Sequence, residues 1–443
     1  MKKTLAFLLA LVMLFTLAAC SKTATEDTAS ASATESSAQT ETAATTEQSS
    51  EEATTIVFMA QSGAPTCMYD LIDKFEAAYP EIKVEVNEVS ANETYDQLVL
   101  TSQAGNPPDV YMTYWTISAA TNGLAADLSE FIDMDEFTTR FTTAAQGYGE
   151  WEGKIYAIPY RSGASIIFAN ATMFENAGIE LPYDGWTWDE FYAIAKQLTN
   201  VEKGEYGFSV CGDASDSGVD WQFWPFLLEA GGSMFDEDNH AAFNSAEGVE
   251  ALNFIIQMID EGIIPPGIAS TNVDQQGELL ASSKVAMFED GPWFMGSVKE
   301  KAGDNCEIVA LPMPVGKTSG SIAGGTALGI SAGSNNKEAA WTFIDFMTSD
   351  ESLNYWCEQF QQVSPLTSVS DSDYYQTQDY LVYAAQLSDP GTIVANHYVD
   401  SDSLNSIMRN YLQAAYLHQM TAQEALDAAA AEWDEILDEY YGN

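Results

Sequence analysis

The sequence predicts an α/β protein with two lobes, each a sheet flanked by helices, joined by crossover segments. Segments of strand character alternate with helical segments from residue 55 onward, which is typical of parallel sheets covered by helices. Between Gly153 and Asn170, two apolar runs flank a break that contains no Asn-Gly or Asp-Gly turn of the kind found in hairpins. We therefore expect the chain to cross there from one sheet to the other.

The first predicted lobe opens with a strand, a helix and a second strand. TIVFMAQSG, from Thr55, reads as a buried strand that runs into a glycine turn, and apolar residues then recur at helical spacing until Pro80. Residues 82–86 alternate apolar and charged side chains, as a half-buried strand does. Ligand crevices of parallel sheets lie beyond the carboxyl ends of the strands, so Gln61 and Ser62 are candidate ligand-binding residues.

A further strand is predicted at residues 109–112, after a Gly-Asn-Pro-Pro break. Tyr114 and Trp115 follow the carboxyl end of this strand and are candidate ligand contacts for the same reason. Large aromatic side chains are commonly packing elements, so a core position for Trp115 is the alternative.

The segment between the two lobes contributes two more candidates. Residues 155–158 read as a strand that Pro159 interrupts, and a second apolar run begins at Ile166. Tyr160 and Arg161 lie in the break, where the chain would pass between the sheets, and both are candidate ligand contacts.

Several segments of the chain resemble extracellular solute-binding proteins of ABC transporters, in the sugar-binding group. The resemblance rests on GKIYAIPY, IIFAN and MFENAGIELP at the predicted crossover, and on AGNPPDVYM and the helix TWDEF. It implies a two-lobed, periplasmic-binding-protein-like fold similar to that of maltose-binding protein, with the lobes joined by hinge crossovers. It also implies a binding protein rather than an enzyme, which captures a sugar or oligosaccharide between its lobes and delivers it to the transmembrane subunits of an ABC permease.

Aromatic residues of the second predicted lobe are candidates for stacking on a sugar. DWQFWPF contains Trp221 and Trp224, for which packing against the following helix is the alternative. ASSKVAMFEDGPW resembles the family's strand and Gly-x-Trp turn, although Ser283 stands where the family has glycine. The resemblance implies that Trp293 contacts the ligand. An indole face suits the C–H groups of a pyranose, and the nearby Asp290 can accept hydrogen bonds from hydroxyl groups.

The chain is expected to return to the first lobe at LPMP, residues 311–314, which resembles the second crossover of the family. The strand that follows contains Gly324 and Gly325, which would let a backbone come close to a ligand. The same strand matches GxSxG around Ser331, with an acidic residue and histidines further on. An extracytoplasmic hydrolase that uses Ser331 or two carboxylates is therefore the rival function.

The N-terminus has the pattern of an export signal. Lys2 and Lys3 precede an apolar run that ends in LAAC, and residues 1–19 are too short for a confident membrane span. LAAC resembles a bacterial lipoprotein box, which implies lipidation of Cys20. Residues 20–54 are rich in Ser, Thr, Ala and Glu and lack apolar residues to bury, so they are expected to form a disordered tether. We expect an extracytoplasmic protein that is anchored to the cell membrane by lipid.

Composition limits the partners. The chain has 66 acidic and 16 basic residues and a formal net charge of −50, which argues against a nucleic-acid partner. A cationic small molecule such as a polyamine is an alternative ligand. No CxxC or HExxH pattern occurs, so no metal or cofactor is expected. Beyond Cys20 the pairing of the cysteines stays open: Cys67, Cys211, Cys306 and Cys357.

The predicted organisation assigns every part of the chain. The protein is expected to be a monomer. The boundaries are 1–19 for the signal peptide, 20–54 for the lipidated cysteine and tether, 55–161 with 313–333 for the first lobe, and 162–312 with 334–443 for the second.

Overall fold

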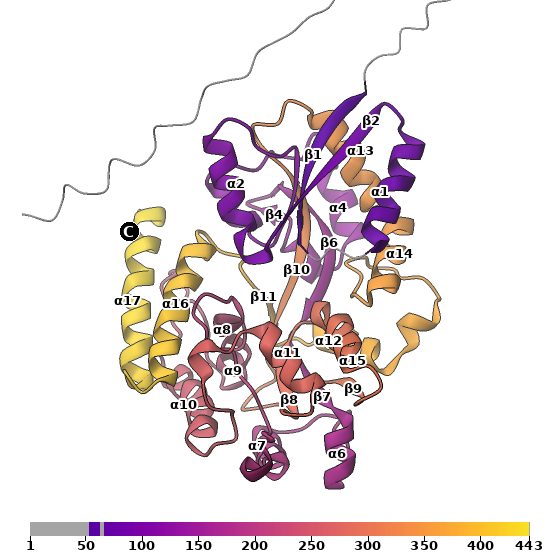
Figure 1. Cartoon of the computed structure of the whole chain (residues 1–443). Coiled ribbons are helices and arrows are strands. Elements are labelled where there is room, and N and C mark those ends of the chain that lie inside the picture. Colours follow the sequence, from indigo (N-terminus) through magenta and orange to yellow (C-terminus); the bar gives the residue numbers. More distant parts are fainter. Residues whose placement is uncertain (1–52, 63–65, 443) are drawn as a thin grey trace, which may run out of the picture. The chain divides into compact units, whose positions relative to one another are not determined.

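The computed structural model describes residues 53–62 and 66–442 (Figure 1). The predicted signal peptide, Cys20 and the tether up to residue 52 lie outside the described residues. Within the described residues, no helix is both long and apolar enough to cross a bilayer.

The first sheet has six strands and confirms the predicted strand–helix–strand unit. β1 (Thr54–Gln61) pairs in parallel with β2 (Ile82–Val89), and α1 (Thr66–Ala78) connects them. The strands follow the order β11-β10-β3-β1-β2, and β6 pairs with β10. The other strands of this sheet are β3 (Val110–Thr113), β6 (Ala157–Ala164), β10 (Ser321–Ile330) and β11 (Thr392–Val394).

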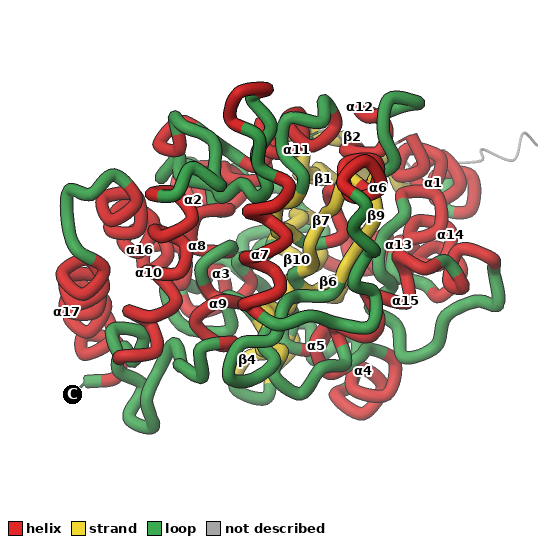
Figure 2. The backbone as a smooth tube through the Cα atoms, turned by 90° about the horizontal axis from the view of Figure 1, so that it is seen from below, coloured by secondary structure: helices red, strands yellow, loops and turns green. Residues whose placement is uncertain are grey.

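The second sheet has three strands, in the order β8-β7-β9, and both pairings are antiparallel. β7 (Ile166–Asn170) is central, between β8 (Met287–Asp290) and β9 (Ile308–Leu311). Helices cover the strands, which lie at the centre of the view in Figure 2.

The predicted passage between sheets is confirmed. β6 belongs to the first sheet and β7 to the second, and Ser165 alone separates them. The chain returns between β9 and β10, through residues 312–320. Pro159 does not interrupt the strand, contrary to expectation. β6 continues through it, since the pairing with β10 shifts register at this point and Pro159 lies beside the bulge, where a missing N–H is tolerated.

The core of the first lobe includes helices that the sequence assigned to the second lobe. Phe343 of α13 (Lys337–Met347) is fully buried, with its ring centroid 5.2 Å from that of Phe58 and 5.1 Å from that of Phe75. α14 (Asp350–Phe360) packs on α1 as well. Residues 337–360 therefore pack on elements of the first lobe, whereas the sequence predicted them in the second. The buried residues of α13 form an apolar stripe, but such a stripe in a sequence does not indicate which sheet it covers.

The second lobe has a core rich in aromatic rings. Trp433 of α17 (Ala422–Tyr441) is fully buried, and its ring contacts those of Trp224, Phe243 and Tyr398. Capping boxes begin α7 (Trp188–Leu198), at Thr187, and α17, at Thr421.

The remaining elements complete both lobes, and all four cysteines of the described part of the chain are buried and free. Beyond short 3₁₀ turns, they are α2 (Thr94–Gln103), α3 (Thr116–Thr121), α4 (Met134–Arg140), α5 (Thr143–Gln146), β4 (Glu150–Trp151), β5 (Lys154–Ile155), α6 (Ala171–Ala177), α8 (Gly218–Trp221), α9 (Trp224–Glu229), α10 (Ala246–Asp260), α11 (Val273–Ala281), α12 (Met295–Ala302), α15 (Gln378–Leu387) and α16 (Ser401–Tyr416).

The packing of α13 on the first lobe leads to a stability prediction. Phe343→Ala should lower the free energy of unfolding by about 3 to 5 kcal/mol, because it leaves a cavity between α13, α1 and β1. Leu417→Ala is the control, because Leu417 is 39% exposed and its loss should cost about 0.5 kcal/mol or less. Denaturant unfolding of both variants measures the difference. Equal losses would contradict the packing described for α13.

Candidate ligand-binding site

Residues of both lobes line a cavity of about 250 Å³, and nine of the twelve residues predicted to bind ligand are among them. From the first lobe come residues just after β3 and on β6 and β10, and from the second lobe come residues of α8 and α9, the end of β8, and the turn after it. The nine are Tyr114, Trp115, Arg161, Trp221, Trp224, Asp290, Trp293, Gly324 and Gly325.

The other three predicted residues do not line the cavity. Gln61 is buried behind it, where its Oε1 accepts a hydrogen bond of 3.1 Å from Nη2 of Arg161. Ser62 is exposed on the turn after β1. Tyr160 is fully buried in the core of the first lobe, with its ring centroid 4.7 Å from that of Trp356. Its ring therefore faces the core and not the cavity, because neighbouring residues of a strand point to opposite faces and Arg161 lies on the cavity side.

Two indole rings form a corner of the cavity. Trp221 ends α8, and Trp293 lies in a 3₁₀ turn that follows β8 and Gly291. The ring centroids are 5.0 Å apart and the ring planes meet at 76°, so one indole presents its face and the other its edge. Both side chains are only partly buried, which leaves ring surface open to the cavity.

Glycines on the crossover strands make room for these rings. Gly163 of β6 pairs with Gly324 of β10. A Cβ on Gly324 would lie 2.4 Å from the ring of Trp221, and one on Gly163 would lie 2.5 Å from Pro292, next to Trp293. Gly324 was predicted to let the backbone approach a ligand. In the structure Gly324 instead leaves room for the indole of Trp221, which packs against the backbone of β10 at this residue.

Gly325 and Trp224 line the cavity but also have structural roles. A Cβ on Gly325 would lie 2.2 Å from the carbonyl oxygen of Arg161, so the close pairing of β6 and β10 requires glycine there. Trp224 is 2% exposed and packs against Trp433, which favours the packing alternative for most of its ring.

The carboxyl groups of the cavity wall lie in a dry environment. Burial raises the pKa of Asp290 to about 7, although its Oδ1 accepts a hydrogen bond of 2.6 Å from the N–H of Gly291. Burial also raises the pKa of Asp220 to about 6, against the opposing effect of Arg409, whose Nη1 lies 3.2 Å from Oδ1 of Asp220. Carboxyl groups held in this way can accept hydrogen bonds from a polar ligand.

The guanidinium group of Arg161 lines the cavity together with Asp290. Burial lowers the pKa of Arg161 to about 10, which still leaves the group charged at neutral pH. The Arg161 guanidinium carbon lies 5.9 Å from the ring centroid of Trp293, within reach of a cation–π contact. The cavity therefore combines apolar ring surface with both hydrogen-bond donors and acceptors.

Several residues of the cavity wall were not predicted. Asp216 and Asp220 were missed, although they flank the start of α8 in the polar run DASDSGVD, just before the aromatic residues that were chosen. A polar run beside an aromatic cluster was the available signal. Tyr148, Thr326 and Tyr398 also line the cavity, and no local pattern marks them, since the fold brings them there from three distant segments.

The alternative hydrolase site is not assembled around Ser331. Ser331 is fully buried, and its Oγ has no hydrogen-bond partner among the described residues. His397 instead bonds through Nδ1 to the carbonyl oxygen of Gly147. A serine nucleophile needs a base within hydrogen-bond reach, so this arrangement does not support the GxSxG interpretation. No group of three or more metal-ligating side chains occurs in the part of the chain that the structure describes.

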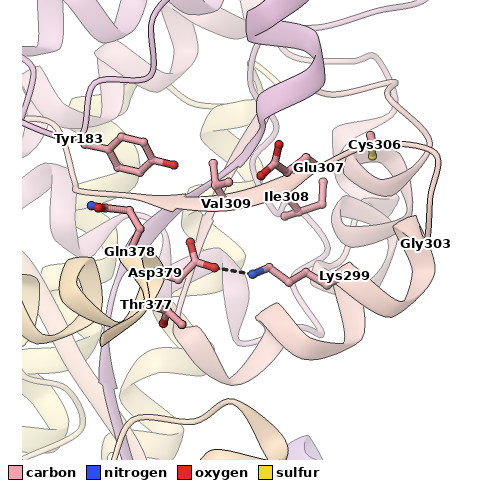
Figure 3. A pocket seen from close by; sticks show the side chains of 10 residues that line it. All are labelled: Tyr183, Lys299, Gly303, Cys306, Glu307, Ile308, Val309, Thr377, Gln378 and Asp379. Carbon is pink, nitrogen blue, oxygen red and sulfur yellow. Dashed lines mark hydrogen bonds and ion pairs between the residues drawn. The ribbon is translucent and has the colours of Figure 1, made fainter. Parts of the chain in front are cut away.

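A second hollow, of about 420 Å³, lies on the second lobe beside β9, α12 and α15 (Figure 3). Two of its charged groups, Lys299 and Asp379, form an ion pair with each other. Oδ1 of Asp379 also accepts a hydrogen bond of 2.8 Å from the N–H of Ala310. None of the predicted site residues lies in it.

Comparison with known proteins identifies the family. Residues 70–381 match the model of the bacterial extracellular solute-binding protein family. The chain belongs to this family. The resemblance read from the crossover segments is thereby confirmed, and so is the α/β fold of two lobes.

Individual members of the family match over most of the chain. A protein of Brucella abortus (strain 2308), named only as a binding protein, is 26% identical over 400 residues, which are 88% of this chain and 94% of that one. A solute-binding protein of an ABC transporter from Thermotoga lettingae, solved with α-D-tagatose, has a TM-score of 0.80 at 24% identity, over 87% of this chain and 100% of that one. The GacH receptor of Streptomyces glaucescens, studied unliganded and with acarbose, has a TM-score of 0.78 at 23% identity, over 87% of this chain and 99% of that one.

The buried carboxyl of Asp290 gives this family member a testable pH dependence in the ligand-free state. Because the folded protein holds the proton up to about pH 7 and the unfolded chain releases it near pH 4, the free energy of unfolding should fall as pH rises between these values. Asp290→Asn should remove on the order of 1 to 3 kcal/mol of that fall. Denaturant unfolding at pH 5 and pH 8 measures it.

Asp236→Asn is the control for this experiment. Asp236 lies on an exposed turn, and its Oδ1 accepts a hydrogen bond from the N–H of His240, which lowers its pKa. Its contribution to stability has the opposite sign, since it is present above the unfolded pKa and is lost as pH falls. A fall as steep in Asp290→Asn as in the wild type would show that Asp290 is ionised in the folded protein at neutral pH.

Proposed function

We propose that this protein is the substrate-binding component of an ABC importer, which captures a sugar or oligosaccharide between its lobes and delivers it to a permease. The observation that carries the proposal is the corner of Trp221 and Trp293 beside the buried carboxyl of Asp290. Aromatic rings stack on the C–H faces of sugars, and carboxyl groups accept hydrogen bonds from their hydroxyls. The relatives solved with tagatose and with acarbose support a sugar as the ligand.

Ligand capture would work through the hinge. We assign β1, β2, β3, β6, β10 and β11 with α13 and α14 to the first lobe, and β7, β8 and β9 with the helices that pack on them to the second, following the pairing and packing of the described residues. A ligand that contacts Trp115 on one lobe and Trp293 on the other stabilises the closed arrangement, because it binds that arrangement more tightly than the open one.

We further propose that the protein acts as a monomer outside the cytoplasmic membrane, without catalysis, and is anchored by lipid on Cys20. The family is extracellular, and the sequence LAAC supports the anchor. A lipid anchor combined with a flexible tether would hold the binding domain near its permease.

Replacing Cys20 tests the anchor. Cys20→Ala should leave the folded domain intact and move the protein from the membrane fraction to the medium, because lipid is the proposed attachment. Fractionation with immunoblotting measures the distribution, and Cys306→Ala serves as a control that keeps the anchor. Retention of Cys20→Ala in the membrane fraction would contradict the lipid anchor.

A thermal-shift screen tests the function. D-tagatose, ribitol, maltose and maltotriose, each from 0.1 to 10 mM, should include at least one ligand that raises the melting temperature. A ligand at 100 times its dissociation constant adds about 2.7 kcal/mol of stability. Titration of that sugar at low and moderate salt should give similar affinities. The carboxyls around the cavity make a cationic molecule such as a polyamine the second candidate, and spermidine binding that weakens steeply with salt would favour it.

The two tryptophans Trp293 and Trp224 should separate binding from folding. Trp293→Ala should cost on the order of 2 to 4 kcal/mol of affinity for the sugar found in the screen, as expected for an aromatic hot spot, with a smaller loss of stability. Trp224→Ala should cost roughly 3 to 5 kcal/mol of stability, because its ring is in the core. Calorimetric titration and ligand-free denaturant unfolding measure the two quantities. If Trp293→Ala binds as the wild type does, Trp293 is not a ligand contact.

A further inference from the structure

One side of the aromatic corner is held by a carboxyl group that lies outside the cavity. The indole Nε1 of Trp221 donates a hydrogen bond of 3.0 Å to Oε1 of Glu289. Glu289 is the third residue of β8, is fully buried, and does not line the cavity. The next residue, Asp290, does line it. Successive residues of a strand point to opposite faces, so β8 supplies a cavity carboxyl on one face and the partner of Trp221 on the other.

The ring of Trp221 packs at the edge of the second-lobe core, and two further contacts border it. Its far edge lies against the backbone of Gly324, and its partner ring, Trp293, meets it at 76°. Both are apolar contacts, which fix how far the ring can move toward the strand but set its rotation only weakly. The hydrogen bond to Glu289 is directional, since N–H···O bonds prefer angles above about 150°, and it therefore determines which ring surface faces the cavity.

A neutral side chain is sufficient for this task. Burial raises the pKa of Glu289 well above its usual range, and the nearby Asp290 acts in the same direction. Burial thus favours the neutral form of the carboxyl, and its role toward Trp221 is that of a hydrogen-bond acceptor. A glutamine, which keeps an acceptor oxygen in nearly the same place, should replace it.

A second tryptophan–glutamate hydrogen bond, which resembles that of Trp221 and Glu289, lies away from the cavity and can serve as a control. Nε1 of Trp188 donates a hydrogen bond of 2.5 Å to Oε2 of Glu229, and Glu229 is fully buried with a pKa that burial also raises. Neither Trp188 nor Glu229 lines the cavity. The two pairs therefore have the same chemistry, and only the pair of Glu289 and Trp221 reaches the proposed site.

We propose that Glu289 is a positioning residue, which sets ligand affinity by orienting the ring of Trp221 and does not itself touch the ligand. This inference rests on the proposed function, because it assumes that the ligand occupies the cavity beside Trp221. It also has a consequence that needs no ligand, since the ring should become mobile when its acceptor is removed.

The first measurement is made on the ligand-free protein labelled with 5-fluorotryptophan. The ¹⁹F resonance of Trp221 is assigned by its absence in Trp221→Phe. Glu289→Leu should shift or broaden this resonance, and Glu289→Gln should restore it to near the wild-type position. Glu229→Leu should change the resonance of Trp188 and leave that of Trp221 unchanged. A Trp221 resonance that does not respond to Glu289→Leu overturns the positioning role whether or not any sugar binds.

The second measurement is affinity for the member of the panel of D-tagatose, ribitol, maltose and maltotriose that stabilises the wild type. Glu289→Leu should weaken binding by about tenfold or more, and Glu289→Gln should recover affinity to within about threefold. Glu229→Leu should lose folding stability to a similar extent without a matching loss of affinity, because it removes the same kind of buried acceptor elsewhere.

A double-mutant cycle decides whether Glu289 acts through Trp221. In the Trp221→Phe background, which has no indole N–H, Glu289→Leu should cause no further loss of affinity, within about twofold. An equal loss in both backgrounds, or an equal loss in Glu229→Leu, overturns the proposal in favour of a general structural effect. If Glu289→Leu does not fold, Glu289→Met replaces it. If no sugar of the panel binds, the proposed function is in doubt, while the ¹⁹F measurement still tests the positioning of the ring.

Discussion

The antiparallel pairing of β6 with β10 is the interaction on which the rest of the structure depends. It runs from Ala157 opposite Gly329 to Ala164 opposite Ala323, and at its end one strand leads into the second sheet while the other arrives from it. These two of the connections between the lobes are therefore held side by side by backbone hydrogen bonds. The paired glycines, Gly163 and Gly324, lie where second-lobe tryptophans rest on these strands. Because Gly163 and Gly324 have no side chains, the rings of Trp293 and Trp221 can lie directly against β6 and β10. The ligand cavity is therefore formed at the same place as the hinge.

The electrostatics of the cavity follow from the same closeness of the two lobes. Dry surroundings raise the pKa of Asp290 and Asp220 and lower that of Arg161, so each charged form is destabilised by burial. Groups of this kind have lost part of their hydration before any ligand arrives. A polar ligand that hydrogen-bonds to them therefore displaces fewer water molecules, and the desolvation cost of binding is smaller. This favours a neutral ligand with many hydroxyl groups.

The sequence was most informative where local pattern and family resemblance agreed. The strand after Thr55 and the passage between sheets were both predicted correctly, since each depends on neighbouring residues. Nine site residues were placed at the cavity, because strand ends and fixed turns carry them there. Tyr160 was misplaced, since a one-residue step along a strand reverses the side chain and the break at Pro159 concealed the phase. Tyr148 and Tyr398 reach the cavity from distant segments, and no local sequence pattern identifies such residues. The sequence of α13 has an apolar face, but this does not indicate which lobe the helix packs on.

The four buried free thiols have a consequence for handling this extracellular protein. Burial raises the pKa of Cys67 to about 11, and it raises the pKa values of Cys211 and Cys357 as well, so few thiolates exist at neutral pH while the fold is intact. Cys67 and Cys357 belong to the core of the first lobe, whereas Cys211 and Cys306 belong to cores of the second. The thiols of Cys67, Cys211 and Cys357 are thus weakly reactive while the fold is intact. A thiol reagent can modify each cysteine only while the core around it is exposed to solvent. The modification rates of the cysteines would therefore report the unfolding of each lobe separately.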